Sequence, residues 1–135
     1  MFIDASAICS ILLKENDTVV LSRKLETSGA KRTSALAVWE SAVALTKQAD
    51  LPPAQALSVV RRFLTNSGIE IVAIPPEAGD LAVSAFERFG KGRHPAALNF
   101  GDCFSYACAR HLDAPLLYKG GDFSLTDIHS ALAGG

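Results

Sequence analysis

Two carboxylates stand close after predicted strands, where the side chains of an open sheet often bind a ligand. Asp4 comes after the apolar pair at positions 2–3, and Asp122 comes after the apolar run at 116–118 and a Gly-Gly turn. In an open parallel sheet, ligands bind beyond the carboxyl ends of the strands. Each acid taken alone is also explained by ordinary turn chemistry at the end of a strand.

Two further carboxylates lie in predicted helices. Glu40 is in the middle of a helical segment, with apolar residues three and four positions away on the same face. An ionised carboxylate beside an apolar stripe is costly to bury unless it meets a cation or hydrogen-bond donors. The alternative is that Glu40 borders the stripe and reaches water or Lys47. Asp102 opens a helix after Asn99, where helix capping alone would explain it.

The four acids are more informative as a set than singly. Carboxylates that converge on one pocket repel one another unless a divalent cation neutralises them. Oxygen ligands without His or Cys select a hard ion, so the set predicts a Mg²⁺ or Mn²⁺ site. Such a site performs phosphodiester chemistry, in which the metal activates a water for in-line attack.

The framework that would position these acids is an alternation of strands and helices. Strands separated by helices predict a parallel sheet covered on both faces. Ser6 is a candidate cap for the first helix. The predicted strands are 2–3, 33–34, 69–74 and 115–118, and the predicted helices are 6–14, 18–27, 36–48, 53–66, 77–89 and 102–112.

Length and composition predict a single domain over residues 1–135, because 135 residues with 49% hydrophobic content bury an ordinary core. No apolar run approaches the ~20 residues that span a bilayer, and an acid at position 4 precedes any signal-peptide core. We therefore expect a cytoplasmic protein. The three cysteines are odd in number and match no metal-binding spacing, so we interpret them as reduced.

The charge balance excludes a globally basic nucleic-acid binder. Thirteen Lys and Arg against fourteen Asp and Glu give a net charge of -1, so the chain lacks a positive field overall. Binding of a polyanion would need a local basic rim around a bound cation. The candidates for such a rim are Lys14, Lys31, Arg32, Lys91, Arg93 and Lys119.

Three stretches resemble the PIN domains of VapC toxins, and together they cover essentially the whole chain in the right order. The first is Phe-Ile-Asp-Ala-Ser-Ala at 2–7, followed by Glu40 in a helix after Thr33-Ser34. The second is Leu-Asn-Phe-Gly-Asp-Cys-Phe-Ser-Tyr-Ala at 98–107. The third is Leu-Leu-Tyr-Lys-Gly-Gly-Asp-Phe at 116–123, extended by Thr-Asp-Ile at 126–128. The Asn-Phe-Gly-Asp and Lys-Gly-x-Asp-Phe stretches are the specific ones.

The resemblance implies a PIN-like three-layer α/β/α sandwich with a central, mainly parallel sheet of four to five short strands. It also implies RNA cleavage that depends on Mg²⁺ or Mn²⁺, homodimers, and inhibition by a cognate VapB antitoxin. Carried over residue by residue, it makes Asp4 and Asp102 direct metal ligands. Glu40 would act directly or through water, Ser6 would orient a water or phosphate, and Asp122 would complete the acid group.

One position departs from the family pattern, because many relatives have Asp where this chain has Gly121. Either Asp122 or Asp127 would replace that acid, or the site would function with three. The departure also leaves open a degenerate PIN fold that serves only as a binding module.

The remaining alternative is another Mg²⁺-dependent, phosphoryl-hydrolysing α/β domain. A phosphotransfer receiver needs a central phosphoacceptor Asp, and the segment Ile74-Pro75-Pro76 supplies none. A small phosphatase needs a second Asp two residues after Asp4, where this chain has Ser6.

Overall fold

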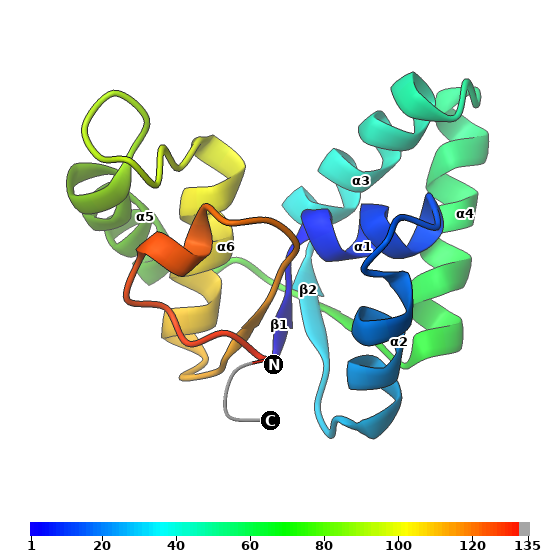
Figure 1. Ribbon diagram of the computed structural model, residues 1–135, viewed down its shortest axis with the longest axis horizontal. Coiled ribbons are helices and arrows are strands. Elements are labelled where there is room, and N and C mark those ends of the chain that lie inside the picture. Colours follow the sequence, from blue (N-terminus) through cyan, green and yellow to red (C-terminus); the bar gives the residue numbers. More distant parts are fainter. Residues whose placement is uncertain (133–135) are drawn as a thin grey trace.

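The protein is a three-layer structure in which one small sheet lies between two layers of helices (Figure 1). The computed structural model describes residues 1–132. Its elements in chain order are β1 (Phe2–Ile3), α1 (Ala5–Leu12), α2 (Thr18–Thr27), β2 (Arg32–Ser34), α3 (Ala35–Gln48), α4 (Pro53–Ser67), β3 (Glu70–Val72), α5 (Pro76–Phe89), α6 (Phe100–His111), β4 (Leu116–Leu117) and the 3₁₀ helix η1 (Phe123–Leu125).

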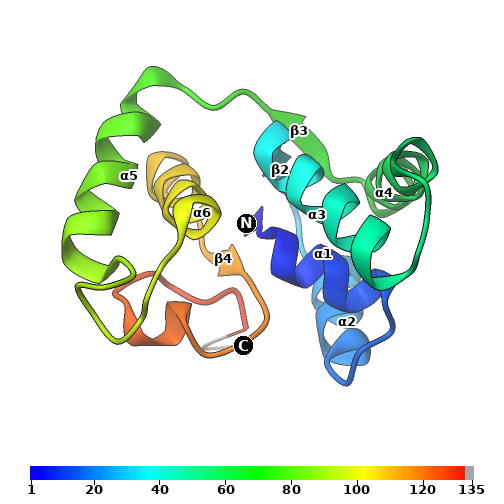
Figure 2. The same ribbon diagram turned by 90° about the horizontal axis from the view of Figure 1, so that it is seen from above.

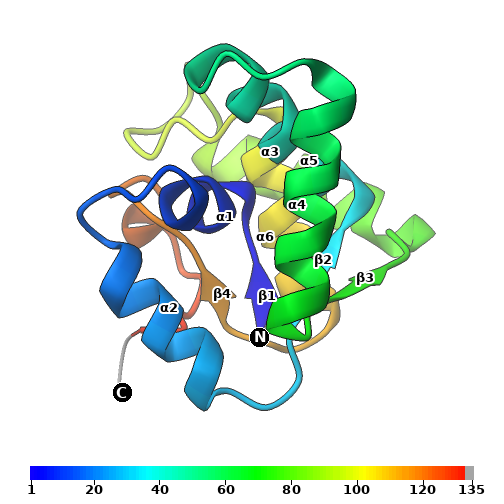
Figure 3. The same ribbon diagram turned by 90° about the vertical axis from the view of Figure 1, so that its right-hand side faces the viewer.

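The sheet has four parallel strands in the order β3-β2-β1-β4, which can be followed in Figure 3. Helices α1 to α4 cover one face, and α5 and α6 cover the other (Figure 2). This arrangement confirms the predicted fold class, including the parallel sheet and the number of strands. The strand order reverses between β1 and β4, and ligands in open α/β sheets bind at such a point, beyond the carboxyl ends of the strands.

Strands β1 and β4 are buried on both faces because their side chains alternate between two cores. Phe2 and Leu116 pack with α5 and α6, whereas Ile3 and Leu117 pack with the helices of the other layer. The register pairs Phe2 with Leu116 and Ile3 with Leu117, so each face of the strand pair is uniformly apolar. The register therefore fixes the end of β1 at Ile3 and places Asp4 directly beyond it.

The helices agree with the sequence prediction more closely than the strands do. The predicted helix 18–27 has the bounds of α2, and Gly68 ends α4 with φ +67°. Strand β3 is shorter than the predicted 69–74, because its partner β2 offers only three residues for pairing. The prediction that Ser6 caps α1 is wrong: the cap is Asp4, whose Oδ2 accepts a hydrogen bond from the Ser6 amide at 3.0 Å.

Two global expectations can be compared with the described residues. No helix within residues 1–132 is both long enough and apolar enough to cross a membrane. All three cysteines, Cys9, Cys103 and Cys108, are free thiols, as their spacing predicts.

Candidate active site

Three helices begin at the carboxyl edge of the sheet, next to the end of β1. Each carries a polar cap: Asp4 for α1, Ser34 for α3, and Asn99 for α6. The caps satisfy backbone N–H groups that would otherwise have no partner in the first turn. The amino-terminal ends of helices carry partial positive charge. The edge is therefore a place where carboxylates are tolerated.

Asp4 is held by one bond from its own helix and one from α6. The side chain is 3% exposed, and while Oδ2 caps α1, Oδ1 accepts a hydrogen bond of 2.5 Å from the Ser105 hydroxyl. The two residues are 101 positions apart in the sequence. Sequence reasoning gave Ser105 no role, because a serine inside a helix carries no local signal for a distant acid.

Asp102 is both a helix-capping residue and a member of the acid set. Its amide donates to Asn99 Oδ1 at 2.9 Å, and its Oδ2 accepts from the Asn99 amide at 3.1 Å. This reciprocal capping box was readable from the spacing of Asn99 and Asp102. Asn99 rather than Asp102 is the cap, so α6 begins two residues earlier than predicted.

Glu40 extends from α3 towards the start of α6. Its carboxylate lies against Gly101, where an added Cβ would overlap Oε2. The expected alternative partner, Lys47, lines a groove between α3 and α4 instead. Burial, together with the charges of Asp4 and Asp102, raises the pKa of Glu40 to about 7. The structure therefore brings these three acids together, as the sequence predicts.

Of the two candidates for a fourth acid, only Asp122 lies near enough for its charge to act on Asp102, and it stays a prediction as a member of the site. The pKa of Asp102 is raised to about 6, chiefly by burial; the hydrogen bond from the Asn99 amide lowers it, and the charges of Asp4 and Asp122 raise it. Asp127 is engaged elsewhere: it pairs with Arg88 at 2.9 Å and accepts a hydrogen bond from the Tyr106 hydroxyl. Although burial raises its pKa, the bonds from Tyr106 and Arg88 lower it overall.

The set of Asp4, Glu40, Asp102 and Asp122, called the acid cluster below, has no cationic side chain bound to it. The two ion pairs within residues 1–132 join Arg88 to Asp127 and Lys119 to Glu15. In the same residues, no three His, Cys, Asp or Glu side chains stand close enough to enclose a metal ion by themselves. Mg²⁺ commonly takes one or two carboxylates and completes its shell with water. An oxygen-only cluster with unneutralised charge fits such an ion.

The raised pKa values predict a pH dependence of stability in the metal-free protein. The folded pKa values of Glu40 and Asp102 exceed their ordinary values of 4.5 and 3.8. The folded state therefore binds more protons than the unfolded state between pH 4 and 7. Stability should be full near pH 4 and should fall as the pH rises through 6 and 7. We expect a loss of about 2 kcal/mol, allowing for solvent screening of half-buried groups.

Urea unfolding in EDTA at pH 5 and pH 8 measures this loss, and saturating Mn²⁺ should reduce it. Other groups also titrate in this range, so the informative quantity is the difference between the wild type and Glu40→Gln. The substitution should flatten the pH dependence. An equal pH dependence of stability in both proteins would show that ionising Glu40 does not destabilise the folded state.

Ser6 and Lys119 join the start of α1 to the segment after β4. The Lys119 amide donates to Ser6 Oγ at 3.0 Å. As an acceptor in this bond, the Ser6 hydroxyl keeps its own hydrogen as a donor. Its orientation of a water or phosphate stays a prediction. The Lys119 ammonium pairs with Glu15 at 3.1 Å.

The predicted basic rim is only partly at this edge. Lys31 and Arg32 lie at the amino-terminal end of β2, opposite the acid cluster, and the Lys31 ammonium donates to the Leu25 carbonyl. The prediction is wrong for these two, because they stand at the amino-terminal end of β2 whereas the acid cluster stands at the carboxyl ends of the strands. Lys91, by contrast, lines a cavity together with Asn99 and Phe100 at the start of α6.

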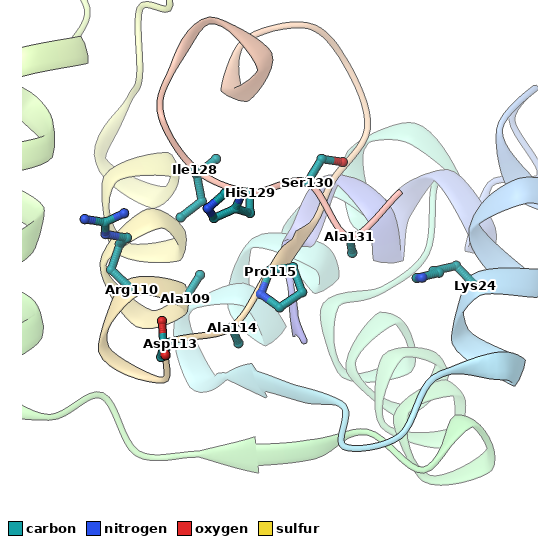
Figure 4. A pocket seen from close by; sticks show the side chains of 10 residues that line it. All are labelled: Lys24, Ala109, Arg110, Asp113, Ala114, Pro115, Ile128, His129, Ser130 and Ala131. Carbon is teal, nitrogen blue, oxygen red and sulfur yellow. The ribbon is translucent and has the colours of Figure 1, made fainter. Parts of the chain in front are cut away.

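A cavity of about 550 Å³ lies at the other end of the sheet and contains no member of the acid cluster. It surrounds Pro115, which precedes β4, and its charged side chains do not converge. Lys24 and Arg110 stand at opposite sides of it (Figure 4). Volume alone therefore does not identify the site, and the carboxyl edge of the sheet remains the candidate.

Comparison with known proteins gives consistent matches over the whole chain. Residues 1–128 match the family described as PIN domain. A ribonuclease VapC of Mycolicibacterium smegmatis is 37% identical over 95% of this chain and 97% of its own. Ribonuclease VapC42 of Mycobacterium tuberculosis H37Rv is 39% identical, covering 97% and 98%.

A solved structure shares the fold. The crystal structure of Mycobacterium tuberculosis VapC20, described as a sarcin-ricin loop cleaving toxin, superposes with a TM-score of 0.74 over 94% of this chain and 95% of that one. The two sequences are 16% identical. The superposition therefore shows that the two chains share a fold.

Proposed function

This chain belongs to the PIN-domain family and, within it, to the VapC toxins, and on that premise we propose that it is a Mg²⁺- or Mn²⁺-dependent endoribonuclease. The matches confirm the resemblance that the three sequence stretches indicate. Membership of this family argues against the alternative of an unrelated phosphoryl-hydrolysing α/β domain. The proposal therefore concerns the chemistry of the acid cluster and its partners.

The observation that carries the proposal is the acid cluster itself. Its members come from β1, α3, α6 and the segment after β4, and two of them have pKa values raised to about 7 and about 6. A cluster of acids that costs stability is retained where it serves a function. The absence of His and Cys among its ligands favours a hard cation.

Each acid has a proposed role. Asp4 and Asp102 would bind the metal, because they come from the two elements that the Ser105 hydrogen bond ties together. When bound, Mg²⁺ or Mn²⁺ would activate a water for in-line attack on an RNA phosphodiester and offset the charge of the phosphate. Glu40 Oε would accept a proton from the attacking water, for which a pKa near neutrality is suited.

Asp122 is proposed as the fourth acid, and substitution tests it. If Asp122 belongs to the site, Asp122→Asn should lower the cleavage rate at least tenfold, about 1.4 kcal/mol, because it removes one of the negative charges that attract the cation. Gly121→Asp should keep or raise activity, since an added Cβ there meets nothing within 4 Å. Cleavage rates and Mn²⁺ affinities of both variants give the answer. An unchanged rate in Asp122→Asn would leave a three-acid site.

Two kinds of protein partner are proposed, a VapB-type antitoxin and a second copy of the chain. Large apolar side chains are exposed next to the acids: Trp39, beside Glu40, is 62% exposed, and Phe100, two residues before Asp102, is 69% exposed. Exposed apolar patches of this kind mark interaction surfaces. An Arg of the antitoxin would find complementary charge in the acid cluster.

The experiment that tests the function is expression of the chain in a bacterial cytoplasm, where we propose that it acts. Growth should stop, and sequencing of RNA ends should reveal new ends at defined positions. Co-expression with an antitoxin encoded next to the gene should restore growth, and the two proteins should co-purify. Unaltered RNA at full expression of folded protein would favour the binding-module alternative.

A further inference from the structure

We propose that two residues of α6, Gly101 and Ser105, are positioning residues that set where the carboxylates of Glu40 and Asp4 stand. The inference rests on the proposed function, because its purpose is metal binding at the acid cluster. It adds two residues that touch neither metal nor substrate. Helix α6 would then act in three ways: it supplies Asp102, it accommodates Glu40, and it orients Asp4.

Ser105 acts through a hydrogen bond in a closed environment. It is 4% exposed, and its hydroxyl donates to Oδ1 of Asp4, which is itself 3% exposed. A buried carboxylate needs its donors, since an oxygen left without one loses free energy. The bond also restricts rotation of the carboxylate, because Oδ2 is bound at the same time by the Ser6 amide. Both oxygens of Asp4 are thus fixed in orientation.

Gly101 acts through the absence of a side chain. It is buried, and a Cβ built on it would overlap the Glu40 carboxylate. The backbone of α6 therefore approaches α3 closely enough for Glu40 to lie over the first turn. Any larger residue at 101 would push Glu40 away from Asp102. Gly79, the helical glycine of α5, meets nothing within 4 Å, so close packing is not a general property of helical glycines here.

The two residues share one face of α6. Positions 101 and 105 are four apart, so their side chains point the same way from successive turns. That face meets α3 at its first turn and the end of β1 at its second, which the contacts with Glu40 and Asp4 show. A single helix face thereby sets the spacing of acids that come from two other elements.

Mn²⁺ affinity, measured by calorimetry on the full chain, tests the role of Ser105. Ser105→Ala should weaken Mn²⁺ binding about tenfold, as loss of an outer-shell partner does at other metal sites. Ser41→Ala is the matched control, because Ser41 is also a buried helical serine but its hydroxyl donates to the Ala37 carbonyl at 2.8 Å. The control should lower thermal stability and leave Mn²⁺ affinity unchanged.

A double-substitution cycle tests the role of Gly101. Gly101→Ala should lower both thermal stability and Mn²⁺ affinity in the wild type. In a Glu40→Ala background the same change should cost no stability, because the methyl group then occupies vacated space. Gly79→Ala controls for the general effect of alanine in a helix and should leave Mn²⁺ affinity intact.

The outcomes separate this inference from the proposed function. If the wild type fails to bind Mn²⁺, the proposed function is overturned and this inference with it. If the wild type binds Mn²⁺ and both Ser105→Ala and Gly101→Ala bind it equally well, only the positioning roles are overturned. If Ser41→Ala weakened Mn²⁺ binding as much as Ser105→Ala, the positioning role of Ser105 would be overturned, because loss of any buried serine would have the same effect.

Discussion

Asp4→Asn and Asp102→Asn should each abolish RNA cleavage and growth arrest while the protein stays folded. The amide keeps the shape of the side chain and removes its charge, so the proposed metal ligand is lost with little change in packing. For residues that act as a unit, a loss of at least about a thousandfold in rate is expected. Cleavage of a labelled RNA by the purified variants measures it.

Folding of these variants must be checked independently, and the structure predicts the result. Asp102→Asn removes a half-buried charge from a repulsive cluster, so its metal-free form should be at least as stable as the wild type. Asp80→Asn, on the exposed surface of α5, is the charge-matched control and should keep full activity. Retained cleavage by a well-expressed Asp4→Asn protein would exclude Asp4 as a ligand.

Removal of divalent metal should have an equally large effect. EDTA should abolish cleavage, and Mg²⁺ or Mn²⁺ should restore it, because the acid cluster offers only oxygen ligands. Metal should also stabilise the fold, by about 2.7 kcal/mol at a hundred times its dissociation constant. RNA cleavage and thermal unfolding measured on the same samples test both statements.

The control for this experiment is EDTA already saturated with Mg²⁺, which should not inhibit. A second control is Asp102→Asn, in which Mn²⁺ should no longer raise the unfolding temperature. Full activity of the wild type in excess chelator would contradict the metal mechanism. Activity lost in EDTA but not restored by either ion would point to damage rather than to chelation.

The sequence predicted the layers of the fold well, because these depend on local patterns. Strand and helix alternation determined the parallel sheet, and the apolar pairs around Phe2 and Leu116 determined which strands are buried on both faces. The acids were found because they follow strands or interrupt an apolar helix face. Strand polarity accounts for the position of Asp4 at the end of β1, but not for those of Glu40 and Asp102, which lie in helices.

What the sequence could not provide depends on contacts between distant residues. The Ser105 hydrogen bond to Asp4 and the contact of Gly101 with Glu40 each join elements that no local pattern relates. The partners of Asp127 also could not be read from the sequence, because Arg88 and Tyr106 are distant from it along the chain. The basic rim was predicted only in part, because Lys31 and Arg32 lie at the amino-terminal end of β2, away from the acid cluster.

The position of β1 in the sheet has a consequence for synthesis on the ribosome. Residues Phe2 and Ile3 pair with Leu116 and Leu117, so of the strands within residues 1–132 the earliest in the sequence pairs with the latest. The amino-terminal half can pack its own core earlier, but Asp4 cannot receive the Ser105 hydroxyl until α6 has been made. Long-range pairing of this kind forms late in folding. A nascent chain therefore lacks the hydrogen bond between Asp4 and Ser105, and with it the assembled acid cluster, until α6 has been synthesised.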